Sequence, residues 1–131
     1  MRHEQALSLA TADENAPKTV DFSGHWENQY TSTMDLVVEG KNVRGEYETA
    51  SSIGGGRQRG ELKGYVAGDL ISFLVLWRGG SMTAWVGQMV DDDTTNPKIK
   101  TLWHLVTEIP DPQEPLKFWQ AVWAGADEFH R

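Results

Sequence analysis

The feature that most constrains this chain is an alternation of side-chain character with a period of two, which runs from Phe22 almost to the C-terminus. Successive side chains of a β-strand point to opposite faces, so this period indicates strands. The segments between the strands are rich in glycine, proline, asparagine and aspartate, which favour turns. The pattern predicts strands near residues 22–30, 32–39, 42–50, 60–66, 69–77, 81–91, 98–108 and 116–130.

Short strands joined by tight connections predict an all-β fold. Strands in simple succession favour an antiparallel up-and-down barrel of eight strands, whose interior holds one small ligand and whose closure removes exposed strand edges. A sandwich of two sheets is an alternative that the pattern alone leaves open. We expect one barrel domain over residues 21–131. Residues 1–20 lack strand or sustained helical periodicity, and they predict a disordered N-terminal arm.

Composition excludes several classes of partner. The 131 residues carry a formal charge of −7, which argues against nucleic acid or an anionic membrane surface as partner. No apolar run is long enough to span a bilayer. The absence of cysteine excludes disulfides, a thiolate nucleophile and a thiolate metal site. Six tryptophans predict either a heavily aromatic core or a ligand-binding surface.

The two halves of the chain differ in their predicted outer face. In the first half the outward residues are mostly polar, as at His25, Glu27, Gln29 and Asp35. In the second half both faces are apolar. Strand 69–77 places Ile71, Phe73, Val75 and Trp77 inside, and the register exposes Leu70, Leu74, Leu76, Met82, Ala84, Val86, Val90, Leu102 and Val106. A large apolar patch on one side of a barrel is typical of a subunit interface. We therefore expect a homo-oligomer.

The predicted inward face is unusually polar and aromatic. The stretch "WENQYTS" places Trp26, Asn28, Tyr30 and Ser32 on one face. The later strands add Tyr47, Thr49, Trp77, Ser81, Thr83, Trp85, Trp103 and Leu105. Each buried polar group without a partner costs about 1–3 kcal/mol, so these groups must bond each other, water or a ligand. Aromatic walls with a few fixed polar groups are typical of small-molecule sites.

Catalytic and metal chemistry find little support. Asp91, Asp92 and Asp93 are contiguous in a turn and do not match a calcium loop. The histidines lack the spacing of a metal site. The glycine-rich run "SIGGGRQRG" connects strands and precedes no helix, so it is a poor phosphate loop. With no credible pairing of nucleophile and base, we expect neither an enzyme nor a resident cofactor or metal.

Five segments, in order and suitably separated, carry a family resemblance: "GHWENQYTSTM", "GEYETA", "LWRGGSMTAWVGQ", "IKTLWHL" and "WAGADEF". Together they resemble the avidin/streptavidin family of biotin-binding barrels, from Phe22 to about Phe129. The resemblance implies a non-catalytic protein that binds biotin with high affinity, assembles as a homodimer or homotetramer, and is secreted or periplasmic. Ala10-Thr11-Ala12 is similar to the end of a secretory signal, but the apolar stretch before it is too short and too broken.

The resemblance also assigns roles to single residues. The donors to the ureido oxygen of biotin are Asn28, Ser32 and Tyr47. The acceptors for the ureido N–H groups are Thr49 and Asp127, and Thr83 donates to the thioether sulfur. The carboxylate is held by Ser81 and by the loop that contains Ser51, Ser52 and Ile53. The walls around the bicyclic ring are Trp77, Trp85, Trp103 and Leu105. Trp119 matches a tryptophan that a neighbouring subunit lends to the site.

The sequence departs from the family pattern in ways that keep alternatives open. Tyr30, counted among the ligand-contacting residues, stands where the family has a smaller side chain. Three glycines after Ile53 raise the entropic cost of ordering that loop. The short Arg78–Gly80 connection is similar to dimeric members, whereas Trp119 is typical of tetramers. The alternatives are a barrel of the same fold that carries another small molecule, and an enzyme with Asp127 as its base.

Overall fold

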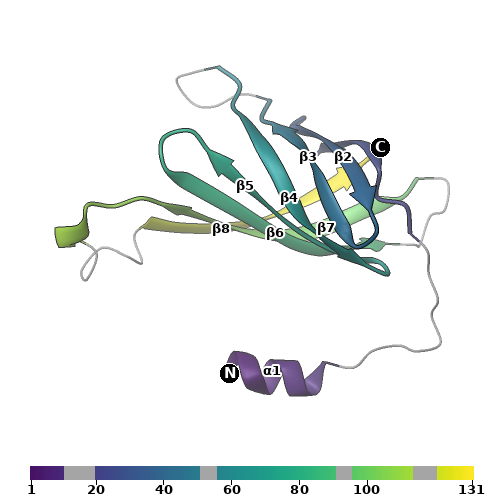
Figure 1. Ribbon diagram of the computed structural model, residues 1–131, viewed down its shortest axis with the longest axis horizontal. Helices are drawn as coiled ribbons and strands as arrows, with labels where there is room; N and C mark the ends of the chain where they lie inside the picture. Colours follow the sequence, from purple (N-terminus) through teal and green to yellow (C-terminus); the bar gives the residue numbers. More distant parts are fainter. Residues whose placement is uncertain (11–19, 51–55, 91–95, 114–120) are drawn as a thin grey trace.

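The computed structural model describes residues 1–10, 20–50, 56–90, 96–113 and 121–131. Its strands form one closed antiparallel barrel in the order β1-β2-β3-β4-β5-β6-β7-β8, which confirms the predicted up-and-down architecture (Figure 1). The elements are α1 (His3–Leu9), β1 (Gly24–Asn28), β2 (Thr33–Glu39), β3 (Asn42–Glu48), β4 (Arg59–Ala67), β5 (Leu70–Trp77), β6 (Ser81–Val90), β7 (Lys98–Thr107), η1 (Asp111–Gln113) and β8 (Val122–His130).

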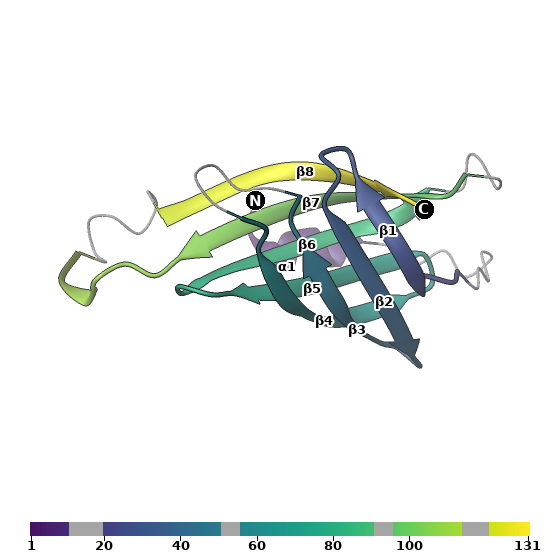
Figure 2. The same cartoon turned by 90° about the horizontal axis from the view of Figure 1, so that it is seen from above.

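The barrel closes through a short contact between its first and last strands. β1 pairs with β8 at only two positions, Glu27 with His130 and Asn28 with Phe129. β6, β7 and β8 are paired over much longer stretches, and they extend past the shorter strands at one end of the barrel (Figure 2). β1 therefore does not run alongside the first part of β8.

Tight connections follow from residues that tolerate unusual backbone conformations. Between β5 and β6 the chain reverses over Arg78, Gly79 and Gly80. Gly79 and Gly80 have φ angles of 92° and 85°, which side chains with a Cβ rarely adopt. This turn sets the register in which Trp77 lies opposite Ser81.

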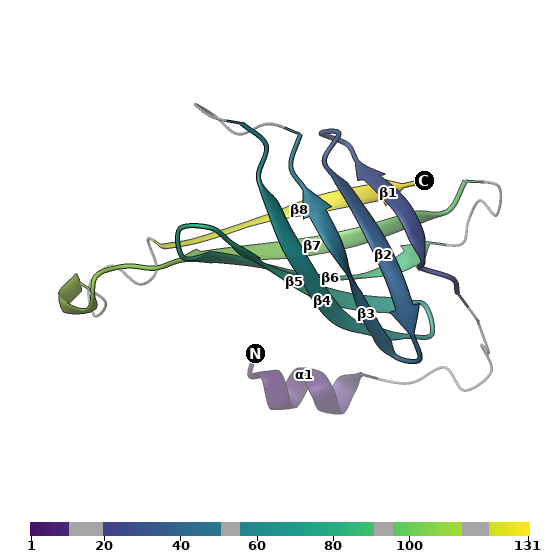
Figure 3. The same cartoon turned by 45° about the horizontal axis from the view of Figure 1, so that its top comes forward.

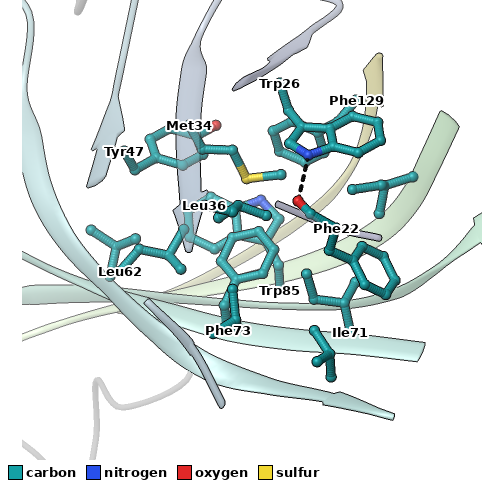
Figure 4. Close-up of a cluster of buried hydrophobic side chains, with 14 of the residues drawn as sticks. Phe22, Trp26, Met34, Leu36, Tyr47, Leu62, Ile71, Phe73, Trp85 and Phe129 are labelled. Carbon is teal, nitrogen blue, oxygen red and sulfur yellow. Dashed lines mark hydrogen bonds between the residues drawn. The ribbon is translucent and has the colours of Figure 1, made fainter. Parts of the chain in front are cut away.

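The core lies inside the barrel (Figure 4), and the end that contains Phe22, Trp26 and Arg131 is called the closed end. There Trp26 is fully buried, and its Nε1 donates to the carbonyl oxygen of Phe22 at 2.9 Å. The guanidinium of Arg131 lies 4.2 Å from the centre of the Trp26 ring and donates to the carbonyl oxygens of Asp21 and Ser23. These contacts seal the end at which the chain enters and leaves the barrel.

The predicted faces of the central strands are confirmed. In β5, Ile71, Phe73, Val75 and Trp77 are buried, and the residues between them are exposed. The outer face of β5 to β8 is largely apolar, with exposed Leu70, Leu74, Leu76, Met82, Val86, Leu102 and Val106. A groove of about 640 Å³, which we call the outer groove, lies on this face, and its lining residues include Leu70, Val86, Leu102, Lys100, Gln29 and Asp127.

The N-terminal arm differs from its prediction in one respect. Residues 1–20 are predicted to be a disordered arm without sustained helical periodicity, whereas His3–Leu9 form the short helix α1 (Figure 3). Its first turn is supported locally, because the side chain of Gln5 accepts a hydrogen bond from the backbone N–H of Arg2. None of its residues is buried. No helix in the described part of the chain has the length and apolar character needed to cross a membrane.

Candidate functional site

The turn after β1 orients Asn28 toward the interior. The carboxamide oxygen of Asn28 accepts hydrogen bonds from the backbone N–H groups of Tyr30 and Ser32, at 2.9 and 3.0 Å. Both bonds occupy the oxygen, so the amide nitrogen is the atom left to face inward. It donates to the phenol oxygen of Tyr47 at 3.2 Å. Asn28 is thus held as an inward-facing donor by its own turn.

This turn also overturns one prediction. Tyr30 was expected on the inward face, but its side chain is 73% exposed. β1 ends at Asn28, and Thr31 adopts a φ of 65°, so the alternation of an extended strand stops before Tyr30. Ser32, which follows the turn, is buried as expected. The alternation placed Tyr30 inward because the predicted strand extended to residue 30, two residues beyond the observed end of β1.

Tyr47 is the centre of a polar cluster with Asn28 and Ser32. Burial raises the pKa of its phenol above the ordinary value, and the negative charge of Asp127 adds to this, while hydrogen bonds with Ser32 and Asn28 oppose it. The phenol therefore remains protonated and keeps an O–H to donate. The Ser32 hydroxyl oxygen also accepts from the backbone N–H of Ala50 at 3.2 Å, which fixes it beside the end of β3.

Asp127 is a buried carboxylate with a partner on each oxygen. Its Oδ2 accepts from the indole N–H of Trp85 at 2.9 Å, and its Oδ1 accepts from the side-chain amide of Gln29 at 3.2 Å. Gln29 was predicted as an outward polar residue, and sequence reasoning missed this contact. The backbone N–H of Glu128 donates to the Gln29 carboxamide oxygen, so Gln29 bridges the end of β1 to β8.

Two hydroxyl groups are held at the other predicted polar positions. The Thr83 hydroxyl is buried and accepts from the indole N–H of Trp77 at 2.8 Å, which leaves its own proton free to be donated elsewhere. The Thr49 hydroxyl accepts from the backbone N–H of Gln58 at 2.9 Å. Ser81, half-buried, lies opposite Trp77 in the register of β5 and β6.

The aromatic residues form a continuous wall. Trp85 stacks against Phe73 and Tyr47, with ring centroids 5.0 and 4.9 Å apart. Tyr47 also meets Trp77 edge-on at 5.8 Å. Phe73 was predicted to be inward but was not assigned to the site, because a phenylalanine on a strand is most simply read as core.

The position of the Trp103 indole depends on Gly125, which lies opposite it on the neighbouring strand. Trp103 is half-buried on β7 and lies opposite Gly125 of β8. A Cβ added to Gly125 would lie 2.5 Å from Cζ2 of Trp103, closer than carbon atoms approach. The indole therefore covers the space that a side chain at position 125 would fill.

The register brings the predicted residues into successive rows across β5 to β8. One row joins Phe73, Trp85, Trp103 and Gly125, and the next joins Ile71, Gly87, Thr101 and Asp127. Further from the closed end, a third row joins Val75, Thr83, Leu105 and Trp123. The inward face of these rows, together with Asn28, Ser32 and Tyr47, is the candidate site. The outer groove is lined mostly by residues of the opposite face of the same strands, although Gly87, Thr101 and Asp127 of the second row also line it.

Some predictions fall outside the described residues. These are Ser51, Ser52 and Ile53 of the β3–β4 connection, Asp91, Asp92 and Asp93, and Trp119. Within the part of the chain that the structure describes, no group of three acidic, histidine or cysteine side chains is placed to hold a metal ion.

The site is chemically suited to holding a small ligand by prepositioned hydrogen bonds. Among the described residues, every buried side-chain nitrogen and oxygen already has a hydrogen-bond partner. The pairs Asn28–Tyr47, Trp77–Thr83 and Trp85–Asp127 therefore fix their groups before any ligand arrives. Groups held in advance lose little further freedom on binding.

Fold and site define a small closed barrel with a polar cluster and an aromatic wall inside it. The family model of the avidin family matches residues 16–131, and the chain belongs to that family. A search of the curated proteins by sequence finds no match.

Solved structures agree with this membership. The biotin binding protein from chicken is 25% identical, with a TM-score of 0.72, and the match covers 85% of this chain and 95% of that one. The rhizavidin–biotin complex is 29% identical, with a TM-score of 0.66 and coverage of 84% and 91%. Xenavidin, at 24% identity, has a TM-score of 0.72 over 87% of this chain and 99% of its own, and shows the fold.

Proposed function

We propose that this chain binds biotin non-covalently and with high affinity inside the barrel, without catalysing a reaction. The observation that carries the proposal is the cluster of Asn28, Ser32 and Tyr47, in which the turn orients the amide N–H inward and burial keeps the phenol protonated. Three such donors suit a carbonyl oxygen that carries partial negative charge, as in a cyclic urea. Asp127 and Thr49 supply acceptors for the urea N–H groups.

The remaining roles follow the family pattern. Thr83, with its proton free, donates to the thioether sulfur. The bicycle packs among Trp77, Trp85, Trp103 and Leu105. The carboxylate is held by Ser81 and by the segment with Ser51, Ser52 and Ile53. Support for this arrangement comes from the family membership and from relatives named as a biotin binding protein and as a biotin complex.

The competing proposal is a carrier of another small molecule. It rested on two arguments, namely that Tyr30 crowds the ureido end of the site and that the loop after Ile53 is rich in glycine. Tyr30 is 73% exposed in the turn after β1, so crowding of the interior by its ring has no support. An enzyme based on Asp127 is also less favoured, because both oxygens of that carboxylate already accept hydrogen bonds.

We further propose that the outer face of β5 to β8 is a subunit interface, in a homodimer or homotetramer. The support is its run of exposed apolar side chains and the outer groove of about 640 Å³. In a tetramer, Trp119 of a neighbouring subunit would complete the site. Export from the cytoplasm is part of the same family-based proposal.

The experiment that tests the binding proposal compares biotin with its carboxamide by isothermal titration. We expect both to bind, because the ureido end is unchanged, and biotin to bind more tightly because only its carboxylate engages Ser81. Binding of neither ligand would refute the proposal. Equal affinity for both ligands would be consistent with the role of the ureido cluster but would contradict the proposed contact between Ser81 and the carboxylate.

A further inference from the structure

Trp123 is an aromatic residue for which neither the family resemblance nor the proposed site has a role. It lies on β8 and is 52% exposed. Side chains of a strand alternate between faces, so Trp123 shares a face with Gly125 and Asp127. The Asp127 carboxylate is inside the barrel, and the Trp103 indole covers Gly125 from the inside. Trp123 therefore belongs to the inward face, not to the outer apolar face.

Its position along the barrel is fixed by the register. Trp123 is opposite Leu105, which is opposite Thr83. Directly opposite side chains have Cβ atoms about 4.5–5.5 Å apart. Trp123 is therefore the last residue of the row that contains Thr83, the proposed donor to the thioether sulfur, and Leu105, a proposed wall residue. The closed end lies beside Phe129, and the sequence Phe129, Asp127, Gly125, Trp123 runs away from it. Trp123 is thus the next inward level beyond the bicycle.

The exposure of the indole makes it available for contact, since Trp123 is 52% exposed in the described structure. β1 pairs with β8 at Glu27–His130 and Asn28–Phe129, so β1 does not run alongside β8 at position 123. A side chain that leaves a bicycle held between Asp127 and Thr83 and extends away from the closed end passes Leu105 and then Trp123. Indole rings offer a large, rigid apolar surface to such a chain at low entropic cost.

We propose that Trp123 is a further wall of the site, which covers the aliphatic chain of the ligand and any apolar group attached to its end. This inference rests on the proposed biotin binding. It implies that the site accepts ligands conjugated through their chain, and that an apolar conjugate gains contacts with the indole. Covering about 50 Å² of the ring corresponds to roughly a tenfold change in affinity.

The test uses three ligands that share the ureido bicycle: biotin, its anilide, and the bicycle without a side chain. Titrations are made with the wild type, Trp123→Ala, Trp123→Phe, and a control, Tyr65→Ala, which removes an exposed aromatic ring from β4. We expect Trp123→Ala to weaken the anilide about tenfold, biotin less, and the bare bicycle not at all. Trp123→Phe should retain most of the wild-type preference, and Tyr65→Ala all of it.

The outcomes separate this inference from the function on which it rests. If the wild type binds none of the three ligands, the proposed function fails and the inference fails with it. If the wild type binds biotin and Trp123→Ala changes all three affinities equally, or none, only the inference is overturned. Sedimentation of the same variants is run in parallel. A smaller assembly in Trp123→Ala with an equal loss for all ligands assigns Trp123 to a subunit contact instead.

Discussion

The indole N–H of Trp85 donates to Oδ2 of Asp127 at 2.9 Å, and this bond ties β6 to β8 across the width of β7. It has two consequences. The carboxylate is held at a fixed point on the inward face, and the Trp85 ring is held against Phe73 and Tyr47. One hydrogen bond therefore couples the polar and aromatic parts of the candidate site.

Replacing Trp85 with phenylalanine should show how much the hydrogen bond between Trp85 and Asp127 contributes to stability. The change keeps an aromatic ring but removes the N–H, so a buried carboxylate loses a donor. We expect the free energy of unfolding to fall by about 1–3 kcal/mol, measured in urea. Asp127→Asn in the Trp85→Phe background should cost less than in the wild type, since the two groups act as a pair. Strictly additive losses would show that the pair is not coupled.

Tyr47→Phe should change how stability depends on pH. Burial raises the pKa of the folded phenol above about 10, its ordinary value, so the folded protein favours the neutral form. This contribution is complete below about pH 10 and is lost as the pH rises toward the folded pKa, by up to about 1.4 kcal/mol per pH unit. The wild type should therefore lose stability more steeply than Tyr47→Phe above about pH 10. Parallel slopes would contradict a buried phenol.

Gly125→Ala should displace Trp103. The added Cβ would lie 2.5 Å from Cζ2 of the indole, and a rigid ring has to move as a whole. We expect a loss of about 1–3 kcal/mol of stability and more than a tenfold loss of ligand affinity. Ala124→Ser, which adds an atom to the exposed face of the same strand, is the control. Unchanged affinity in Gly125→Ala would show that Trp103 does not line the site.

A charge in the outer groove should disrupt assembly. Leu102 is 63% exposed and lines that groove. Because an interface would bury it, Leu102→Glu should reduce the mass seen by analytical ultracentrifugation while the circular dichroism of the barrel is kept. Tyr65→Glu, on the exposed face of β4, should leave the mass unchanged. A wild type that is already monomeric would refute the interface.

The strand pattern predicted the barrel well because alternation is imposed by geometry at every position. The inward sets of β5 and β6, including Trp77, Thr83 and Trp85, followed directly from it and are buried. Asn28 and Ser32 were also placed correctly, although a turn separates them.

The errors arose where a side chain interrupts the local pattern. The Asn28 carboxamide accepts two backbone N–H groups and ends β1 early, so Tyr30 turns outward and Gln29 reaches the Asp127 carboxylate. An alternation with a period of two predicts neither the outward position of Tyr30 nor the contact of Gln29 with Asp127. The fit of Trp103 over Gly125 depends on strand register, which pattern alone does not supply. Helix α1 was missed because its support is local and it buries no residue.

The most direct test of the central claim is a calorimetric titration of the wild type and of the Asn28→Ala/Ser32→Ala double variant with biotin. The account predicts tight binding to the wild type at one ligand per chain and no measurable binding to the double variant, with the barrel retained by circular dichroism. No heat and no thermal stabilisation of the wild type would mean that the barrel has kept its fold and binds something else. Undiminished binding by the double variant would contradict the role assigned to the donor cluster.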